Sequence, residues 1–128
     1  MEKNLMENIE KIPMYKNKVE KIYSAISNKN NLKEAYIAIV AMIESVLTVL
    51  LKKVYNEDIK TTHLATISKL LTKHKENMLS EEAIYINSNR EDDEYMEDID
   101  EMDIEYLTER LDNILKIILE KHGNIFEK

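Results

Sequence analysis

The sequence predicts an all-α protein, an antiparallel bundle of four to five helices with one long central helix. Apolar residues recur at spacings of three and four along most of the chain, which is the periodicity of a helical face. The 128 residues include one Gly and one Pro, too few to build the turns of an all-β fold. A chain of this length supports one core, so we expect a single domain over residues 1–128.

The first part of the chain predicts a short turn, a helix and then the central helix. Residues 5–12 have the pattern of an amphipathic turn, which Pro13 either ends or restarts. Residues 14–26 carry apolar side chains on one helical face, and the polar stretch 27–31 separates them from the next helix. Residues 32–55 form the predicted central helix, whose apolar side chains lie in nearly every direction.

One narrow stripe along the central helix is small or polar instead. Its charged ends favour a solvent-facing seam over a surface for close approach of another helix. The stripe consists of Glu34, Ala38, Ala41, Ser45, Thr48 and Lys52.

Glu44 is the only charged residue between positions 35 and 51. An isolated buried charge is very costly, and no basic residue lies three or four positions away. We expect Glu44 to lie beside the polar seam, or to form a salt bridge with Arg90 across the bundle. The apolar run is short for a membrane span and carries this carboxylate, so it favours a buried helix. The N-terminus has no apolar run of the kind that is typical of a signal peptide, so we expect a cytoplasmic location.

Two shorter helices are predicted after the central one. Thr61 or Thr62 is expected to begin the first, whose apolar side continues to residue 71. Ser80 is expected to cap the second, because its hydroxyl can accept a bond from a free N–H and acidic residues follow it. The apolar side of this second helix consists of Leu79, Ala83, Ile84 and Ile86.

The last predicted helix has the most regular pattern in the chain. It is expected to begin near Asp100 or Asp103 and to end at Gly123, the only glycine. Lys121 and His122 precede that glycine and place cations at the negative end of the helix dipole. The apolar residues of this helix are Ile104, Leu107, Leu111, Ile114, Leu115 and Ile118.

Common catalytic and metal-binding patterns are missing from the sequence. The absence of Cys excludes disulfides, Cys-ligated metals and a thiol nucleophile, and one Gly cannot build a phosphate loop. No Glu-x-x-His motif occurs, and His63 and His74 would lie about 16 Å apart along one helix axis. We therefore expect no metal and no cofactor, with His63, His74 and His122 as surface or capping residues.

The stretch from Glu91 to Glu105 is strongly acidic. Ten of its fifteen residues are Asp or Glu and none is basic, whereas the whole chain has a net charge of −7. One hypothesis is a solvated connector over residues 91–103, kept extended by charge repulsion. The other is a docking surface for a basic partner, because spaced carboxylates attract Lys- and Arg-rich clefts. The partner-binding candidates are Glu91, Asp92, Asp93, Glu94, Glu97 and Asp98.

The order of these pieces resembles the HEPN superfamily of small helical bundles. The resemblance covers residues 31–119 and rests on four segments: AYIAIVAMIESVLTVLLKKV, HLATISKLL, the pair Asn89-Arg90, and EYLTERLDNILKIIL. It implies an α-bundle that commonly forms a two-fold dimer. Many members are metal-independent ribonucleases, often in toxin–antitoxin or phage-defence systems. Their motif is Arg, four to six residues, then His, in which Arg stabilises phosphate charge and His handles the proton.

This chain departs from the family motif at its catalytic position. Tyr95 occupies the nearest position allowed for His, and the next His is His122. A tyrosine with a pKa of about 10 is a poor base at neutral pH. The carboxylates between Arg90 and Tyr95 would also repel RNA. The remaining catalytic candidates are Asn89, Arg90 and Tyr95.

Three hypotheses about function follow. The first is a non-catalytic HEPN-like interaction module that forms a homodimer and binds a protein partner in a stress, toxin–antitoxin or phage-defence setting. The second is a small acidic inhibitor or immunity-type protein that occupies a basic nucleic-acid-binding cleft. The third is a weak metal-independent ribonuclease. The sequence favours the first.

Overall fold

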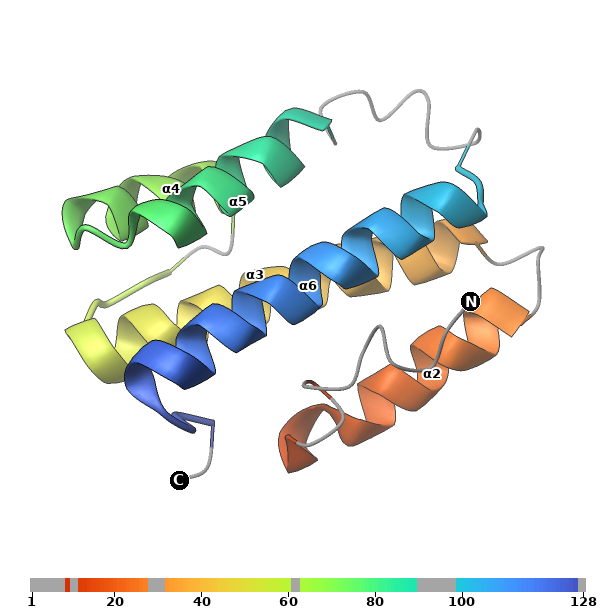
Figure 1. The fold of residues 1–128 in the computed structure, drawn as a ribbon, viewed down its shortest axis with the longest axis horizontal. Coiled ribbons are helices and arrows are strands. Elements are labelled where there is room, and N and C mark those ends of the chain that lie inside the picture. The colour runs from red at the N-terminus through yellow and green to blue at the C-terminus, as the bar shows by residue number, and fades with distance from the viewer. Residues whose placement is uncertain (1–8, 10–11, 28–31, 61–62, 90–98, 127–128) are drawn as a thin grey trace.

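The computed structural model describes residue 9 and residues 12–27, 32–60, 63–89 and 99–126, and within this part of the chain the fold is entirely helical (Figure 1). This confirms the all-α bundle. The elements are the 3-10 helix η2 (Pro13–Tyr15) and the α-helices α2 (Lys16–Ser27), α3 (Leu32–Tyr55), α4 (Leu64–Lys73), α5 (Asn77–Asn89) and α6 (Glu101–His122).

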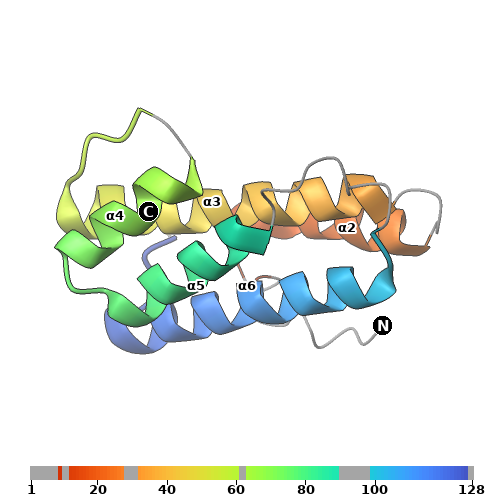
Figure 2. The same ribbon diagram turned by 90° about the horizontal axis from the view of Figure 1, so that it is seen from above.

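The long helices α3 and α6 lie side by side at the centre of the bundle (Figures 1 and 2). Helix α2 packs on α3, and the hairpin of α4 and α5 covers the pair from another side. Helix α3 is antiparallel to α2 but runs in the same direction as α4 and α6. The reason is that residues 56–60, after α3, lead back along the bundle before α4 begins. As a result, the C-terminal ends of α3, α4 and α6 meet at one end of the bundle.

Helix α3 forms the core of the bundle. It is long and apolar enough to cross a membrane, but 56% of its most apolar window is buried within the protein. Burial against three other helices is what its nearly all-round apolar pattern predicts. Its buried residues are Ala35, Ile39, Val40, Met42, Ile43, Val46, Leu47, Thr48, Leu50 and Leu51.

The predicted polar seam on α3 is confirmed along only part of its length. Ala38 and Ala41 are exposed, as are the charged residues at both ends of the stripe. Ser45 is partly covered, because its hydroxyl forms a hydrogen bond of 2.8 Å with the hydroxyl of buried Tyr15. Thr48 is buried, which the sequence did not predict. The seam therefore faces solvent mainly in the first half of α3.

The ends of α6 follow the sequence prediction. Asp100 is the N-cap, and its carboxylate accepts a hydrogen bond of 3.1 Å from the backbone N–H of Asp103. The carboxylate of Asp103 accepts one of 3.0 Å from the backbone N–H of Asp100, which completes a capping box. Gly123 caps the other end with φ 76°, a conformation that favours glycine. Within residues 99–105, the described part of the acidic run, Asp100 to Glu105 belong to the cap and first turns of a helix.

The predicted N-cap at Ser80 is wrong. Helix α5 begins at Asn77, and Ser80 is buried inside it, with its hydroxyl 2.6 Å from that of Thr72 and 3.2 Å from the carbonyl oxygen of Ser68. Ser80 therefore joins α5 to α4 instead of capping a helix. Ile84, expected on the apolar side of α5, is 50% exposed, because the buried positions Leu79, Ala83 and Ile86 define a different face.

The connection between α4 and α5 is a tight turn of three residues. The backbone N–H of Glu76 donates to the carbonyl of Leu71 (2.8 Å), and that of Lys75 donates to the carbonyl of Thr72 (3.0 Å). This is the Schellman arrangement, with Lys75 at φ 64° in the position that glycine usually occupies. The N–H of Ser80 donates to the carbonyl of Glu76 (2.9 Å), so Glu76 ends the turn and precedes the first residue of α5.

Candidate functional site

A polar network lies where the C-terminal ends of α3, α4 and α6 meet. It consists of Tyr55, Glu57, Lys73, His74, Glu76, Lys121 and His122 and is called the Tyr55–Glu76 network below. The C-terminus of each helix carries a partial negative charge, so cationic side chains are favoured there. Two carboxylates, those of Glu57 and Glu76, lie among these cationic side chains. The cationic side chains therefore neutralise both the helix ends and the two carboxylates.

Glu76 is the centre of the network. The residue is 3% exposed and accepts three hydrogen bonds. These come from the hydroxyl of Tyr55 (2.5 Å), Nζ of Lys121 (3.1 Å) and Nε2 of His122 (2.7 Å). One buried carboxylate therefore ties the start of α5 to the C-terminal ends of α3 and α6.

A second carboxylate, Glu57, binds the end of α4. Its Oε2 accepts hydrogen bonds from Nε2 of His74 (2.6 Å) and Nζ of Lys73 (3.0 Å). The Tyr55 ring stacks on His74 with centroids 4.1 Å apart and meets His122 edge-on at 6.2 Å. Tyr55 thus contacts both imidazoles, and each imidazole has its own carboxylate.

The charge states of the network follow from these contacts. Burial opposes ionisation of Glu76, but its bonds with Tyr55, His122 and Lys121 outweigh burial and hold its pKa below the ordinary value of 4.5. Hydrogen bonds from His74 and Lys73 lower the pKa of Glu57. Burial, followed by the Glu76 carboxylate, raises the pKa of Tyr55 to about 12. An ionised carboxylate only accepts, so each histidine Nε2 carries the hydrogen.

We expect acid to weaken the fold through this network. The folded protein holds the pKa of Glu76 below 4.5, so its stabilising contribution is complete above that pH and is lost as the pH falls through the folded pKa. Urea unfolding at a series of pH values between about 6 and 3 measures this loss. Glu76→Gln is expected to flatten the dependence below pH 4.5. An equally steep loss in that variant would contradict the role of Glu76.

The geometry of the network indicates a structural role, which is to hold the ends of the helices together. Both carboxylates already accept bonds from side chains of this chain, and the two histidines are held through Nε2. No group of three or more His, Cys, Asp or Glu residues in the described segments is placed to hold a metal ion. His74 and His122 were expected as surface or capping residues. His74 is the C-cap residue of α4, which confirms the expectation for it, and His122 is the last residue of α6. What the sequence did not predict is that both pair with carboxylates, with side chains only 20% and 15% exposed.

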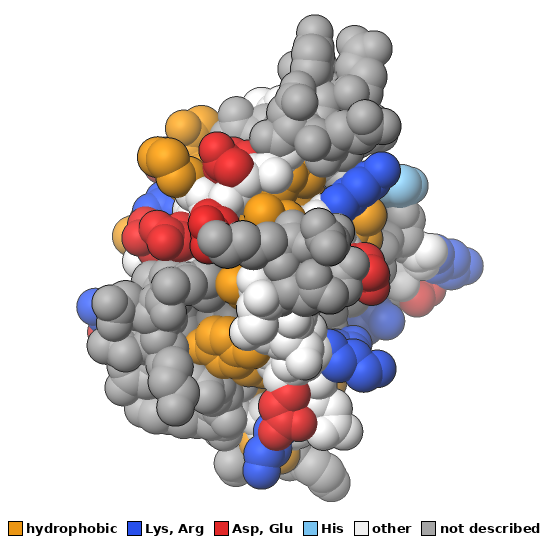
Figure 3. Space-filling model, turned by 90° about the vertical axis from the view of Figure 1, so that its right-hand side faces the viewer, with side chains coloured by type: hydrophobic (Ala, Val, Ile, Leu, Met, Phe, Trp, Pro, Cys, Tyr) orange, Lys and Arg blue, Asp and Glu red, His pale blue; other side chains and the backbone are white. Residues whose placement is uncertain are grey.

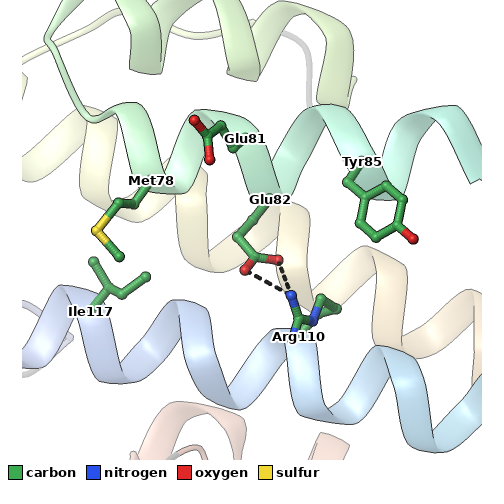
Figure 4. A pocket seen from close by; sticks show the side chains of 6 residues that line it. All are labelled: Met78, Glu81, Glu82, Tyr85, Arg110 and Ile117. Atoms are coloured by element: carbon green, nitrogen blue, oxygen red, sulfur yellow. Dashed lines mark hydrogen bonds and ion pairs between the residues drawn. The ribbon is translucent and has the colours of Figure 1, made fainter.

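A hollow of about 320 Å³ lies between α5 and α6 (Figure 4). Glu82 of α5 and Arg110 of α6 form an ion pair in its lining, with Nη1 3.0 Å from Oε2. Nδ2 of Asn113 also donates to Glu82 (3.0 Å), so this carboxylate is satisfied from α6 alone. The lining residues are Met78, Glu81, Glu82, Tyr85, Arg110 and Ile117.

A second hollow, of about 340 Å³, shares Tyr85 with the first. Three tyrosines from three helices line it: Tyr36 of α3, Tyr85 of α5 and Tyr106 of α6. The rings of Tyr85 and Tyr106 meet edge-on at 5.7 Å, and the Arg110 guanidinium lies 5.6 Å from the Tyr106 centroid. Burial, then the neighbouring Tyr85, raises the pKa of Tyr106 to about 12. The Tyr106 hydroxyl forms no hydrogen bond of ordinary geometry with a described residue.

Large apolar side chains are exposed beside these hollows. Met78 is 64% and Tyr85 53% exposed, and both line the hollows, seven positions apart on α5. Ile84 of the same helix is 50% exposed but lines neither hollow. Tyr, Met and Arg are the side chains enriched at the centres of protein interfaces. We call this surface the α5–α6 face, formed by Met78, Tyr85, Tyr106, Arg110 and Ile117.

Most of the predicted site residues lie outside the described part of the chain. Arg90, Tyr95 and all six acidic partner-binding candidates are among them. Asn89 is the last residue of α5, but its side chain is not described. Glu44 is half-buried on α3 next to Ser45, as the polar seam predicts. The alternative salt bridge to Arg90 falls outside the described residues.

No protein-family model, curated protein or solved structure matches this chain.

Proposed function

We propose that this chain is a helical interaction module, without catalytic activity of its own, that binds a protein partner through the α5–α6 face. The observation that carries the proposal is that exposed Met78 and Tyr85 line two adjoining hollows. Isolated apolar residues on a surface need no explanation, but a contiguous group with concave pockets is typical of interaction sites. The Arg110 and Tyr106 side chains add the aromatic and guanidinium groups that act as anchors.

The HEPN-like order of helices supports the same proposal. In a chain that lacks the family's catalytic His, the scaffold is available for binding alone. The proposed setting is a cytoplasmic stress, toxin–antitoxin or phage-defence system. Formation of a homodimer belongs to the proposal, with the exposed first half of the α3 seam around Ile37 and Ala41 as its contact surface. If sedimentation at micromolar concentration gives only a 15.1 kDa particle, the homodimer is no longer part of the proposal.

A photo-reactive phenylalanine analogue in place of Tyr85 tests the proposal inside the native cell. We expect irradiation to link the chain to one discrete protein, because this position lies at the centre of the face. The same analogue in place of exposed Ser24, on the outer side of α2, is the control and is expected to give no such product. Equal products from both positions would contradict the α5–α6 face as the binding surface.

Incubation with RNA tests the claim that the chain is non-catalytic. We expect purified protein to leave RNA intact, because the family's catalytic His is absent. Cleavage that is lost in Arg90→Ala would overturn this part of the proposal and favour a ribonuclease.

A further inference from the structure

The two hollows on the α5–α6 face meet at Tyr85, and together they are called the groove below. Met78 and Ile117 lie at one end (Figure 4), and Tyr36 and Tyr106 line the other. The groove follows two antiparallel helices, which is the shape that receives the apolar side of a third helix.

The spacing of the exposed anchors suits a helical occupant. Met78 and Tyr85 are seven positions apart on α5, which corresponds to about 10 Å along the axis. A partner helix covers the same distance with apolar residues at positions i, i+3 or i+4, and i+7. An extended strand would need a free sheet edge to pair with, and the described part of the chain contains no strand.

The charge around the groove is strongly negative. Helix α5 and residues 101–117 of α6 together carry seven carboxylates, one guanidinium and one ammonium group, that of Lys116. That guanidinium belongs to Arg110, which is already paired with Glu82. At the end of the bundle where α6 begins, acidic side chains lie next to hydrophobic ones (Figure 3). Glu81, Glu82 and Asp103 line the groove itself.

This charge distribution selects among the occupants. A second copy of the same face would bring like charges together, and nucleic acid or an anionic membrane would be repelled. A helix with Lys or Arg beside its apolar stripe complements both the apolar floor and the acidic rim.

We propose that the groove between α5 and α6 binds an amphipathic helix of a partner protein, with its apolar stripe on Met78 and Tyr85 and its Lys or Arg residues facing Glu81 and Asp103. This inference rests on the proposed function and names the kind of partner that the α5–α6 face receives.

Selection from random peptides tests the inference without assuming a partner. A displayed library of peptides of about 16 residues, long enough for a helix of about 24 Å, is bound to the full chain. Peptides that also bind the Tyr85→Ala protein are removed. We expect the enriched sequences to be cationic, with apolar residues at i, i+3 or i+4, and i+7. Enrichment of acidic, neutral or non-helical sequences would overturn the inference.

Variants of the full chain then locate the binding site for the best cationic peptide. Tyr85→Ala is expected to raise Kd about tenfold or more, as for an interface anchor. Because Tyr85 and Met78 are 53% and 64% exposed, neither Tyr85→Ala nor Met78→Lys is expected to unfold the chain, and both should weaken binding. Glu20→Gln removes the same charge as Glu81→Gln but lies on α2, and only Glu81→Gln is expected to weaken binding. Equal effects of these two substitutions would mean non-specific charge attraction and would overturn the inference.

The two proposals fail in different ways. If position 85 crosslinks to a protein but the library yields no cationic helix, the proposal of an interaction module stands. The proposal that an amphipathic helix occupies the groove is then wrong. A dimer that Tyr85→Ala disrupts would show that a second copy fills the groove and would also remove that occupant. Absence of a crosslinked protein at Tyr85, despite binding of a cationic helix at the groove, counts against the proposed function alone.

Discussion

Glu76→Ala is expected to lower the free energy of unfolding by about 3 to 5 kcal/mol, the range for removing one partner of a buried charge pair. The substitution takes the acceptor from Tyr55, Lys121 and His122 at once. The largely buried donors of Tyr55 and His122 are then left without a partner, whereas Lys121 is 53% exposed and can turn to water. An unsatisfied buried group costs more than a hydrogen bond gains. The α4–α5 turn also loses its attachment to α3 and α6.

Urea unfolding followed by circular dichroism measures the effect of Glu76→Ala. Glu20→Ala is the matched control, because this glutamate is exposed on α2, and we expect a change within about 0.5 kcal/mol. Glu76→Gln is expected to fall between the two, since an amide oxygen in the place of Oε2 can still accept from Tyr55 and His122, but the charge is lost. A loss from Glu76→Ala no larger than that of the control would show that the network contributes nothing to the fold.

The second large effect is expected at the centre of α3. Leu47 is completely buried, so Leu47→Ala removes apolar surface and leaves a cavity, at a cost of about 2 to 5 kcal/mol. Val54→Ala on the same helix is the control. Val54 is 36% exposed and lies outside the proposed dimer contact, and we expect its loss to cost much less stability than that of Leu47. Similar effects at both positions would contradict the orientation of α3 in the bundle.

Much of the helical architecture could be predicted, because it depends on local patterns. Helix α3 has the predicted bounds, and all six apolar residues predicted for α6 are buried. The start of α6 could also be placed within three residues, at Asp100 or Asp103, and these two residues turn out to form its capping box. Helix periodicity and helix caps each depend on residues that are close together in the sequence, so the sequence shows them directly.

The start of α5 could not be predicted from the same signals. Ser80 followed by two glutamates is a good N-cap pattern, yet the helix begins at Asn77. The Schellman turn sets this start. It places Lys75 in a left-handed conformation that glycine usually adopts, so the sequence gives no signal for the turn. Pairing of α5 with α4 through buried Ser80 then favours the longer helix.

The Tyr55–Glu76 network was missed because its members are far apart in the sequence. Tyr55, His74 and His122 each look like ordinary residues near a helix end. They meet only because α3, α4 and α6 all end on the same side of the bundle, which depends on the direction of each helix. The one local signal was the repeated occurrence of cations in the last turn of these three helices.

The position of Glu76 has a consequence for the helix that carries the α5–α6 face. Glu76 directly precedes α5 and lies two residues before Met78, so the helix that presents the exposed anchors is fastened at its first turn. A partner that binds such a prearranged surface loses little affinity to the entropy of ordering it. Disrupting the network would therefore weaken association from a distance, by turning a rigid recognition element into a mobile one.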